Sequence, residues 1–165
     1  MTERKGWMAL DEWQRLVEGI DCPNCQVAAS TADDEFSLYV GRLPLSAVRF
    51  GRNQRAPGYT VVYCRRHVSE PFELTPRYAH GFFDDVMAVA EALQRVYRPL
   101  KLNYQILGNV IPHLHCHIVP RYRGDLAPHA PPHAIFTAPA LELTPEEYAS
   151  AVQRLREELR DRLRS

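Results

Sequence analysis

Three histidines alternate with apolar residues in the stretch from residue 113 to residue 119, which reads His-Leu-His-Cys-His-Ile-Val. Successive side chains of a β-strand point to opposite faces, so a strand here would place His113, His115 and His117 on one face. Imidazole titrates near neutral pH and can act as a base, an acid, a nucleophile or a metal ligand. Three histidines on one face are costly to bury as plain core residues, so the spacing predicts a site of chemistry.

Residues on both sides of this stretch could bind a phosphate group. Gly108 and Asn109 precede it and offer a close backbone approach and a side-chain amide, whereas Arg121 and Arg123 follow it. An imidazole that attacks phosphorus needs such donors for the phosphate oxygens. The alternatives are that the arginines are solvated surface residues and that Asn109 is a plain turn residue.

A pair of cysteines near the N-terminus indicates a metal site. Cys22 and Cys25 have a spacing that is common in zinc sites, and a structural zinc ion needs four ligands. His67 and one histidine of the triad could complete the set. The alternatives are a redox-active pair, whose usual βαβ context is missing, and an incidental pair in a turn.

The elements that must position these residues follow from hydrophobic periodicity. Alternation, or enrichment in β-branched and aromatic residues, predicts strands over 36–43, 47–50, 59–64, 103–107 and 114–119. Helical spacing of apolar residues predicts helices over 7–17, 76–97 and 144–163. This order predicts an α+β fold, in which an antiparallel sheet of about five strands packs against one long helix, with further helices at the N- and C-terminal ends.

Capping and turn residues mark where these elements begin and end. Thr75 followed by Pro76 predicts the start of the long helix, and the run from Thr144 to Glu147 predicts the start of the last one. We expect the Cys-Pro-Asn-Cys stretch to form a turn. Residues 120–143 contain five prolines, which predicts a meandering loop.

Length and charge narrow the class of protein. A chain of 165 residues suits a single domain over residues 1–165. Its 20 basic and 20 acidic residues cancel, so no overall field favours nucleic acid or an anionic membrane as a partner. The apolar stretches are too short to span a bilayer, and the first residues lack the hydrophobic core of a signal peptide. We therefore expect a cytoplasmic protein.

One segment of the chain, LNYQILGNVIPHLHCHIVPRY, resembles the signature of the histidine triad family, in which three histidines alternate with apolar residues. Upstream, the stretches from Asn53 to Gly58, from Arg65 to His67 and from Leu74 to Pro76 are similar to the family's nucleotide-binding half. The resemblance covers about residues 22–123. It leaves the proline-rich loop (120–143) and the C-terminal helix (144–163) as an extension of a HIT-like core.

The resemblance implies a nucleotide hydrolase, or a nucleotidyl transferase, that acts at the α-phosphate of dinucleoside polyphosphates or other nucleotide conjugates through a covalent nucleotidyl-histidine. The middle histidine, His115, would be the nucleophile, and His117 would contact the α-phosphate or the bridging oxygen. Asn53 matches the position that contacts the ribose, and Asn109 matches the amide that binds the phosphate. Arg121 would add a positive charge at the nucleotide.

The resemblance also implies cofactors and a partner. In zinc-containing members the first histidine, here His113, binds the metal with a cysteine pair placed like Cys22 and Cys25 and a histidine placed like His67. Mg²⁺ could accompany a polyphosphate substrate. Many members form homodimers through the long helix and an edge strand, which makes a homodimer the expected state.

Two departures from the family pattern bear on activity. Many members carry Gln-Ser or Gln-Thr where this chain has Asn109 and Val110, so one hydroxyl donor is missing. Many also place a fourth histidine where this chain has Tyr59, which can form a hydrogen bond but cannot act as an imidazole. Two other functions therefore stay open: a nucleotide-binding sensor or interaction module with little turnover, and a metal-dependent hydrolase that uses the histidine strand as ligands.

Overall fold

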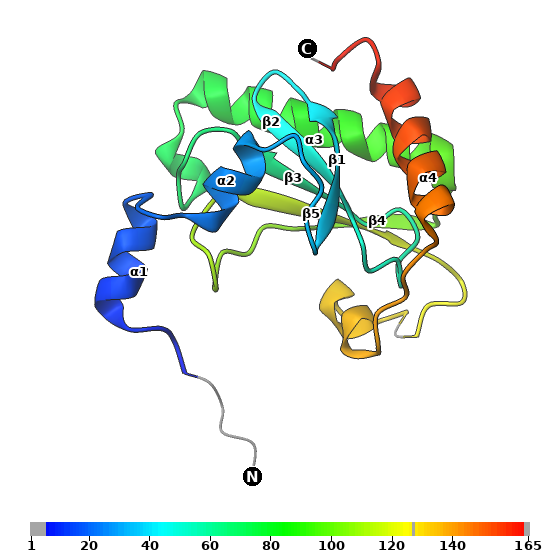
Figure 1. Cartoon of the computed structure of the whole chain (residues 1–165), viewed down its shortest axis with the longest axis horizontal. Coiled ribbons are helices and arrows are strands. Elements are labelled where there is room, and N and C mark those ends of the chain that lie inside the picture. Colours follow the sequence, from blue (N-terminus) through cyan, green and yellow to red (C-terminus); the bar gives the residue numbers. More distant parts are fainter. Residues whose placement is uncertain (1–5, 127, 164–165) are drawn as a thin grey trace.

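The computed structural model describes residues 6–126 and 128–163 of the chain (Figure 1). Within these residues one sheet is formed by β1 (Ser37–Arg42), β2 (Ser46–Gly51), β3 (Thr60–Cys64), β4 (Lys101–Gln105) and β5 (His115–Arg121). Their order across the sheet is β1-β2-β3-β5-β4, and each neighbouring pair is antiparallel. The predicted α+β fold with an antiparallel sheet is confirmed.

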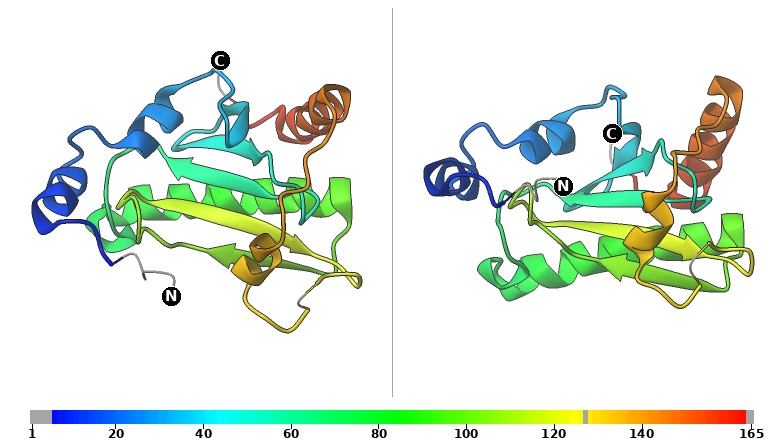
Figure 2. Two further views of the ribbon diagram at one scale, coloured as in Figure 1. Left: turned by 60° about the horizontal axis from the view of Figure 1, so that its bottom comes forward. Right: turned by 90° about the horizontal axis from the view of Figure 1, so that it is seen from below.

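Helices cover both faces of this sheet. The described residues form the helices α1 (Leu10–Val17), α2 (Pro23–Ala29), α3 (Pro76–Tyr97) and α4 (Pro145–Leu159), with short 3-10 helices η1 (Pro71–Glu73) and η2 (Pro132–Thr137). Figure 2 shows α3 along one face of the sheet and α2 on the opposite side. Helix α4 packs against both β1 and α3. None of the described helices is both long and apolar enough to cross a membrane.

The hydrophobic core lies between the sheet and α3. Leu114 and the β5 residues Cys116 and Ile118 are buried there, together with Phe82 and Val89 of α3. Because neighbouring residues of a strand point to opposite faces, this burial turns His115 and His117 away from α3. The alternation in the sequence therefore separates the core from the histidines.

The two predicted helix starts differ in whether the threonine side chain forms a capping hydrogen bond. At the start of α4, the backbone N–H of Glu147 donates to Thr144 Oγ1 at 3.2 Å, and the backbone N–H of Thr144 donates to Glu147 Oε2 at 2.8 Å. This is the predicted capping box. Helix α3 does begin after Thr75, but the hydroxyl of Thr75 forms no capping hydrogen bond.

Three local expectations are wrong. The Cys-Pro-Asn-Cys stretch begins α2 instead of forming a turn, because α2 packs against β2 and β3; Pro23 suits the first helical position that it occupies. Strand β5 begins at His115, so His113 precedes the strand. The proline-rich segment includes η2, since Ile135 is buried against Ala56 and Val119. Residue 127 of that segment, like residues 1–5 and 164–165, lies outside the described residues.

Candidate functional site

Two histidine rings and two tyrosine rings lie side by side on the face of the sheet opposite α3. His115 pairs with Tyr63 across β5 and β3, and their ring centroids are 5.5 Å apart at an interplanar angle of 18°. Tyr59, next to β3, stacks on His117 with centroids 5.9 Å apart at 8°. The rings of His115 and His117 meet edge to face at 4.8 Å. The site is therefore a row of flat rings.

The proton of the His115 ring is placed by the backbone. Nδ1 of His115 lies 2.6 Å from the carbonyl oxygen of His113, which can only accept a hydrogen bond, so Nδ1 carries the hydrogen. Burial lowers the pKa of His115 below its usual value, so the ring is neutral near pH 7. The lone pair is then on Nε2, the atom that could act as a nucleophile.

His117 is oriented by a tyrosine. The Tyr59 hydroxyl lies 2.7 Å from Nδ1 of His117. Burial and the neighbouring His115 lower the pKa of His117 to about 4, and burial raises the pKa of Tyr59 above its usual value. We assign the phenol as the donor, because a neutral phenol donates well and a neutral imidazole nitrogen accepts well. Nε2 of His117 then carries a hydrogen that can be donated.

A cleft of about 260 Å³ opens in front of these rings. It is lined by residues from α2, from β3 and β5, and from the loop between β4 and β5: Asn24, Tyr63, Leu107, Gly108, Asn109, Val110, Ile111, His115 and His117. Gly108 has a φ of +125°, a conformation that favours glycine. Asn109 thus lies in the cleft with both histidines, and its contact with a phosphate stays a prediction.

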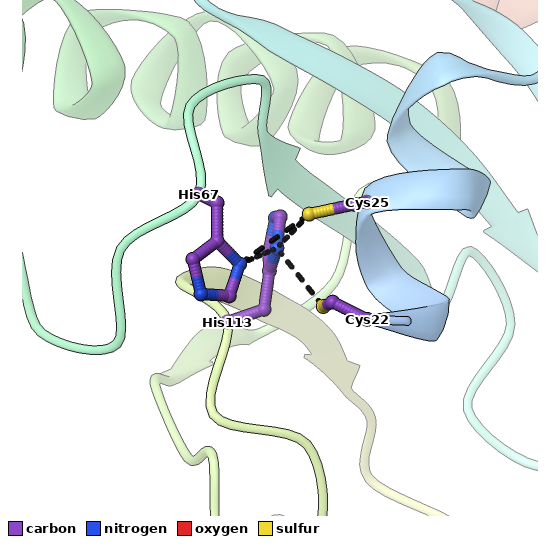
Figure 3. Close-up of side chains that lie close together, drawn as sticks. All are labelled: Cys22, Cys25, His67 and His113. Carbon is purple, nitrogen blue, oxygen red and sulfur yellow. Dashed lines mark hydrogen bonds between the residues drawn. The ribbon is translucent and has the colours of Figure 1, made fainter. Parts of the chain in front are cut away.

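Four side chains converge between α2, the segment after β3 and the segment before β5 (Figure 3). Nδ1 of His113 lies 3.6 Å from Cys22 Sγ and 3.4 Å from Cys25 Sγ. Nδ1 of His67 lies 3.3 Å from Cys25 Sγ and 3.3 Å from Nδ1 of His113. In a tetrahedral zinc site, sulfur–nitrogen and nitrogen–nitrogen separations are roughly 3.5 Å and 3.3 Å. The four predicted metal ligands therefore fit around one ion.

The outer nitrogens of both ligand histidines are held by backbone carbonyls. Nε2 of His113 donates to the Cys64 carbonyl oxygen at 2.9 Å, and Nε2 of His67 donates to the Val17 carbonyl oxygen at 3.0 Å. These bonds leave both Nδ1 atoms unprotonated and able to bind a metal. Burial and Cys22 raise the pKa of Cys25 to about 12, so two thiolates here need a neighbouring cation.

Two predicted nucleotide ligands lie outside this cleft. The side-chain oxygen of Asn53 accepts hydrogen bonds from the backbone N–H groups of Arg55 and Leu141, each at 3.2 Å. Arg121 is buried, pairs with Asp125 at 2.6 Å and donates to Asn103 at 2.8 Å. Both side chains hold the proline-rich segment or its neighbours in place, and their contact with a nucleotide stays a prediction.

Sequence reasoning missed two polar residues that line the cleft. Tyr63 lies opposite His115 in the antiparallel register, so correct pairing of two predicted strands would have found it. Asn24 lies between the two cysteines, but it reaches the cleft because the cysteines begin a helix. Because helix α2 was not predicted, Asn24 was not recognised as a residue of the cleft.

The fold and the site can be compared with known proteins. A family model described as the HIT domain matches residues 35–124. The chain is 32% identical over 79 residues to Protein hit of Bacillus subtilis, a match that covers 44% of this chain and 54% of that protein. It is 30% identical over 105 residues to the asymmetrical bis(5'-nucleosyl)-tetraphosphatase of Schizosaccharomyces pombe, covering 54% of this chain and 58% of that protein. The matches thus span little more than half the length of these curated relatives.

Solved structures give a longer match. A histidine triad protein from Bradyrhizobium japonicum shares the fold with a TM-score of 0.69 at 27% identity, and the match covers 75% of this chain and 91% of that one. The family model itself spans more than half of the chain and includes the whole sheet. On these grounds the chain belongs to the HIT domain family, whose histidine triad it carries at residues 113, 115 and 117.

Proposed function

We propose that this protein is a nucleotide hydrolase that acts at the α-phosphate of dinucleoside polyphosphates or related nucleotide conjugates. The observation that carries the proposal is the 2.6 Å hydrogen bond between His115 Nδ1 and the His113 carbonyl oxygen. It leaves the lone pair of Nε2 on a ring that lines the same cleft as Asn109. The relative from Schizosaccharomyces pombe is named a tetraphosphatase of a dinucleoside, which fits this substrate class.

The chemistry proceeds in two steps. Nε2 of His115 attacks the α-phosphorus, a nitrogen–phosphorus bond forms, and the bond from phosphorus to the leaving oxygen breaks. His117 donates from Nε2 to that oxygen, and Asn109 donates from its amide to a phosphate oxygen. Water then attacks phosphorus and loses one proton to solvent, the nitrogen–phosphorus bond breaks, and the nucleoside monophosphate leaves while His115 returns to its neutral form. Each role is assigned from ring orientation and from position in the cleft.

We also propose that the four converging ligands bind one structural zinc ion. Thiolate and imidazole ligands suit zinc, and their separations match a tetrahedral site. A bound zinc ion would supply folding energy here, because four protein ligands leave no open position for water or substrate. The described residues hold no second cluster of three or more such ligands, so the structure adds no support for the expected Mg²⁺.

Of the two alternatives, the module with little turnover has one observation in its favour. Val110 lines the cleft and is 71% exposed, so the loop lacks a hydroxyl donor at an accessible position. A metal-dependent hydrolase has less support, because the metal ligands include His113 but neither His115 nor His117. The nucleotide hydrolase therefore stands first.

The decisive experiment traps the covalent intermediate. Wild-type protein is mixed with a dinucleoside tetraphosphate that is labelled at the α-phosphates and quenched in alkali, where phosphoramidates survive. We expect a labelled protein adduct in the wild type and none in His115→Ala. The matched control is His80→Ala, because His80 is an exposed histidine of α3 on the other side of the sheet.

Each outcome of this experiment separates the candidates. An adduct that persists in His115→Ala would contradict the assigned nucleophile. Tight nucleotide binding by calorimetry, without adduct and without product, would favour the module. Turnover that is lost in a chelator while the circular dichroism spectrum is unchanged would favour the metal-dependent hydrolase.

A further inference from the structure

Both tryptophans of the chain lie together at a groove beside the histidine cleft. Trp7 and Trp13 meet edge to face, with ring centroids 5.4 Å apart and planes at 88°. Trp7 is 71% exposed. The two rings line a hollow of about 160 Å³ together with Ser69, Glu70, Leu107, Gly108, Asn109 and Pro112. The groove thus combines two flat aromatic rings with a hydroxyl and a carboxylate.

This groove adjoins the proposed catalytic cleft. The two hollows share Leu107, Gly108 and Asn109, so the loop between β4 and β5 is the wall between them. The wall is thin at Gly108, where an added Cβ would meet no atom closer than 3.9 Å. A substrate whose phosphate lies beside Asn109 can therefore extend over this loop towards Trp7 and Trp13.

Trp7 is exposed and Trp13 is half-buried, and neither ring belongs to the hydrophobic core. Helix α1 has no buried residue, and an isolated helix of this length is unstable in water. Its C-terminal end is fixed by the hydrogen bond from His67 to the Val17 carbonyl oxygen. Helix α1 is therefore attached to the rest of the protein through His67, a proposed zinc ligand. Its residue Trp13 lies beside the loop that lines the cleft.

We propose that the groove between Trp7 and Trp13 binds the leaving half of the substrate by stacking its nucleobase on an indole ring. This inference rests on the function proposed above. Aromatic rings bind bases of any sequence through their π faces. The carboxylate of Glu70 disfavours a phosphate in the groove but accepts hydrogen bonds from sugar hydroxyls or base amino groups. The occupant is therefore a nucleoside, and the polyphosphate crosses the loop at Gly108.

Tryptophan fluorescence tests this directly, because both tryptophans of the chain lie in the groove. The protein used is His115→Ala, so that bound nucleotide is not consumed. We expect diadenosine tetraphosphate to quench the emission, and AMP to bind in calorimetry with little quenching. Saturating diadenosine tetraphosphate without any quenching would overturn the proposal.

Kinetics with two substrates give a second test. The double variant Trp7→Leu/Trp13→Leu should raise KM for diadenosine tetraphosphate by about 5- to 150-fold, the range expected for loss of one stacked base. The rate with an adenylate conjugate of a small aliphatic amine should stay unchanged. Phe36→Leu is the matched control, because Phe36 is an aromatic residue that is 75% exposed and lines no hollow with either tryptophan.

The outcomes separate this inference from the proposed function. Equal effects of the double variant on both substrates would overturn the proposal that the groove is a nucleoside site. A double variant that no longer self-associates in sedimentation experiments would also overturn it, since the rings would then serve a contact between proteins. If wild-type protein hydrolyses neither substrate, the proposed function fails. The quenching experiment with His115→Ala still decides the role of the groove in that case.

Discussion

The Tyr59 hydroxyl and Nδ1 of His117 are 2.7 Å apart, and the two rings are nearly parallel. A side chain at Gly51 would collide with the Tyr59 ring, so the glycine leaves room for it. The rings of Phe136 of η2 and Tyr59 are also in contact, with centroids 4.8 Å apart and planes at 48°. The family model ends at residue 124, so an element outside it holds a residue that orients the histidine site.

Removal of the Tyr59 hydroxyl tests this arrangement. We expect Tyr59→Phe to lower kcat about tenfold, equivalent to roughly 1.4 kcal/mol, because Nδ1 of His117 loses its buried partner. KM should change little. Tyr104→Phe, an exposed tyrosine of β4, is the control for steady-state kinetics. Equal kcat values for wild type and Tyr59→Phe would show that the hydrogen bond does not serve the reaction.

Acid should destabilise the protein through His117. Its pKa falls from 6.5 to about 4 on folding, so the unfolded chain binds more protons between these values. The contribution of neutral His117 to the free energy of unfolding is fully present above about pH 6.5. It is lost as the pH falls towards 4, by on the order of 2 kcal/mol at pH 4.5. Tyr59 and His115 face this ring, and burial lowers the pKa of His115 as well.

The pH effect is measured by urea unfolding of wild type and His117→Gln at pH 7 and pH 4.5. Both proteins retain the four proposed metal ligands. Protonation of those ligands therefore changes the stability of both by the same amount and cancels in the comparison. The loss of stability between the two pH values should be smaller in His117→Gln. An identical loss in both proteins would mean that His117 is as easily protonated in the folded state as in the unfolded chain.

Zinc content tests the proposed metal site. We expect about one zinc ion per wild-type chain by atomic emission, and much less in Cys25→Ser, since a serine hydroxyl is a poor zinc ligand. The variant should also unfold at a lower temperature by several degrees, because metal affinity contributes to folding. Cys116→Ala, a change on the core side of β5, should retain the metal. A wild type that is stable and free of metal rules the site out.

A hydroxyl at residue 110 should raise activity. Val110 is exposed in the cleft, so Val110→Ser removes no core packing and adds a donor near the phosphate position beside Asn109. We expect kcat/KM for a dinucleoside tetraphosphate to rise severalfold, which is the range expected for one ordinary net hydrogen bond. Val110→Ala separates the hydroxyl from the loss of side-chain volume. If the serine and alanine variants are equally active, no hydroxyl contact forms.

Residue alternation and capping patterns predicted most of the fold. Leu114, Cys116 and Ile118 are apolar at every second position, and this pattern placed the core on one face and two histidines on the other. Thr144 and Glu147 predicted the start of α4 because a capping box is a local interaction. Such features depend on neighbours in the chain and can be read without knowledge of the fold.

Features that depend on packing could not be read in the same way. The sequence near Cys22 and Cys25 is compatible with a turn or a helix, and the contacts of α2 with β2 and β3 decide for the helix. His113 fits the alternation, yet it precedes β5 and faces the cysteines. One of the two hydrogen-bond donors to Asn53 is the backbone N–H of Leu141, far along the chain. These outcomes depend on contacts between distant segments.

The cluster of Cys22, Cys25, His67 and His113 also has a consequence for folding of the chain. Cys22 and His113 are 91 positions apart, so a metal ion held by both closes a loop that contains four of the five described strands, β1 to β4, and helix α3. Closing a loop of this length costs conformational entropy, and the four ligands converge only after folding has met that cost. In a reducing environment, where disulfides are rare, the ion would act as a reversible cross-link that forms once the strands are paired.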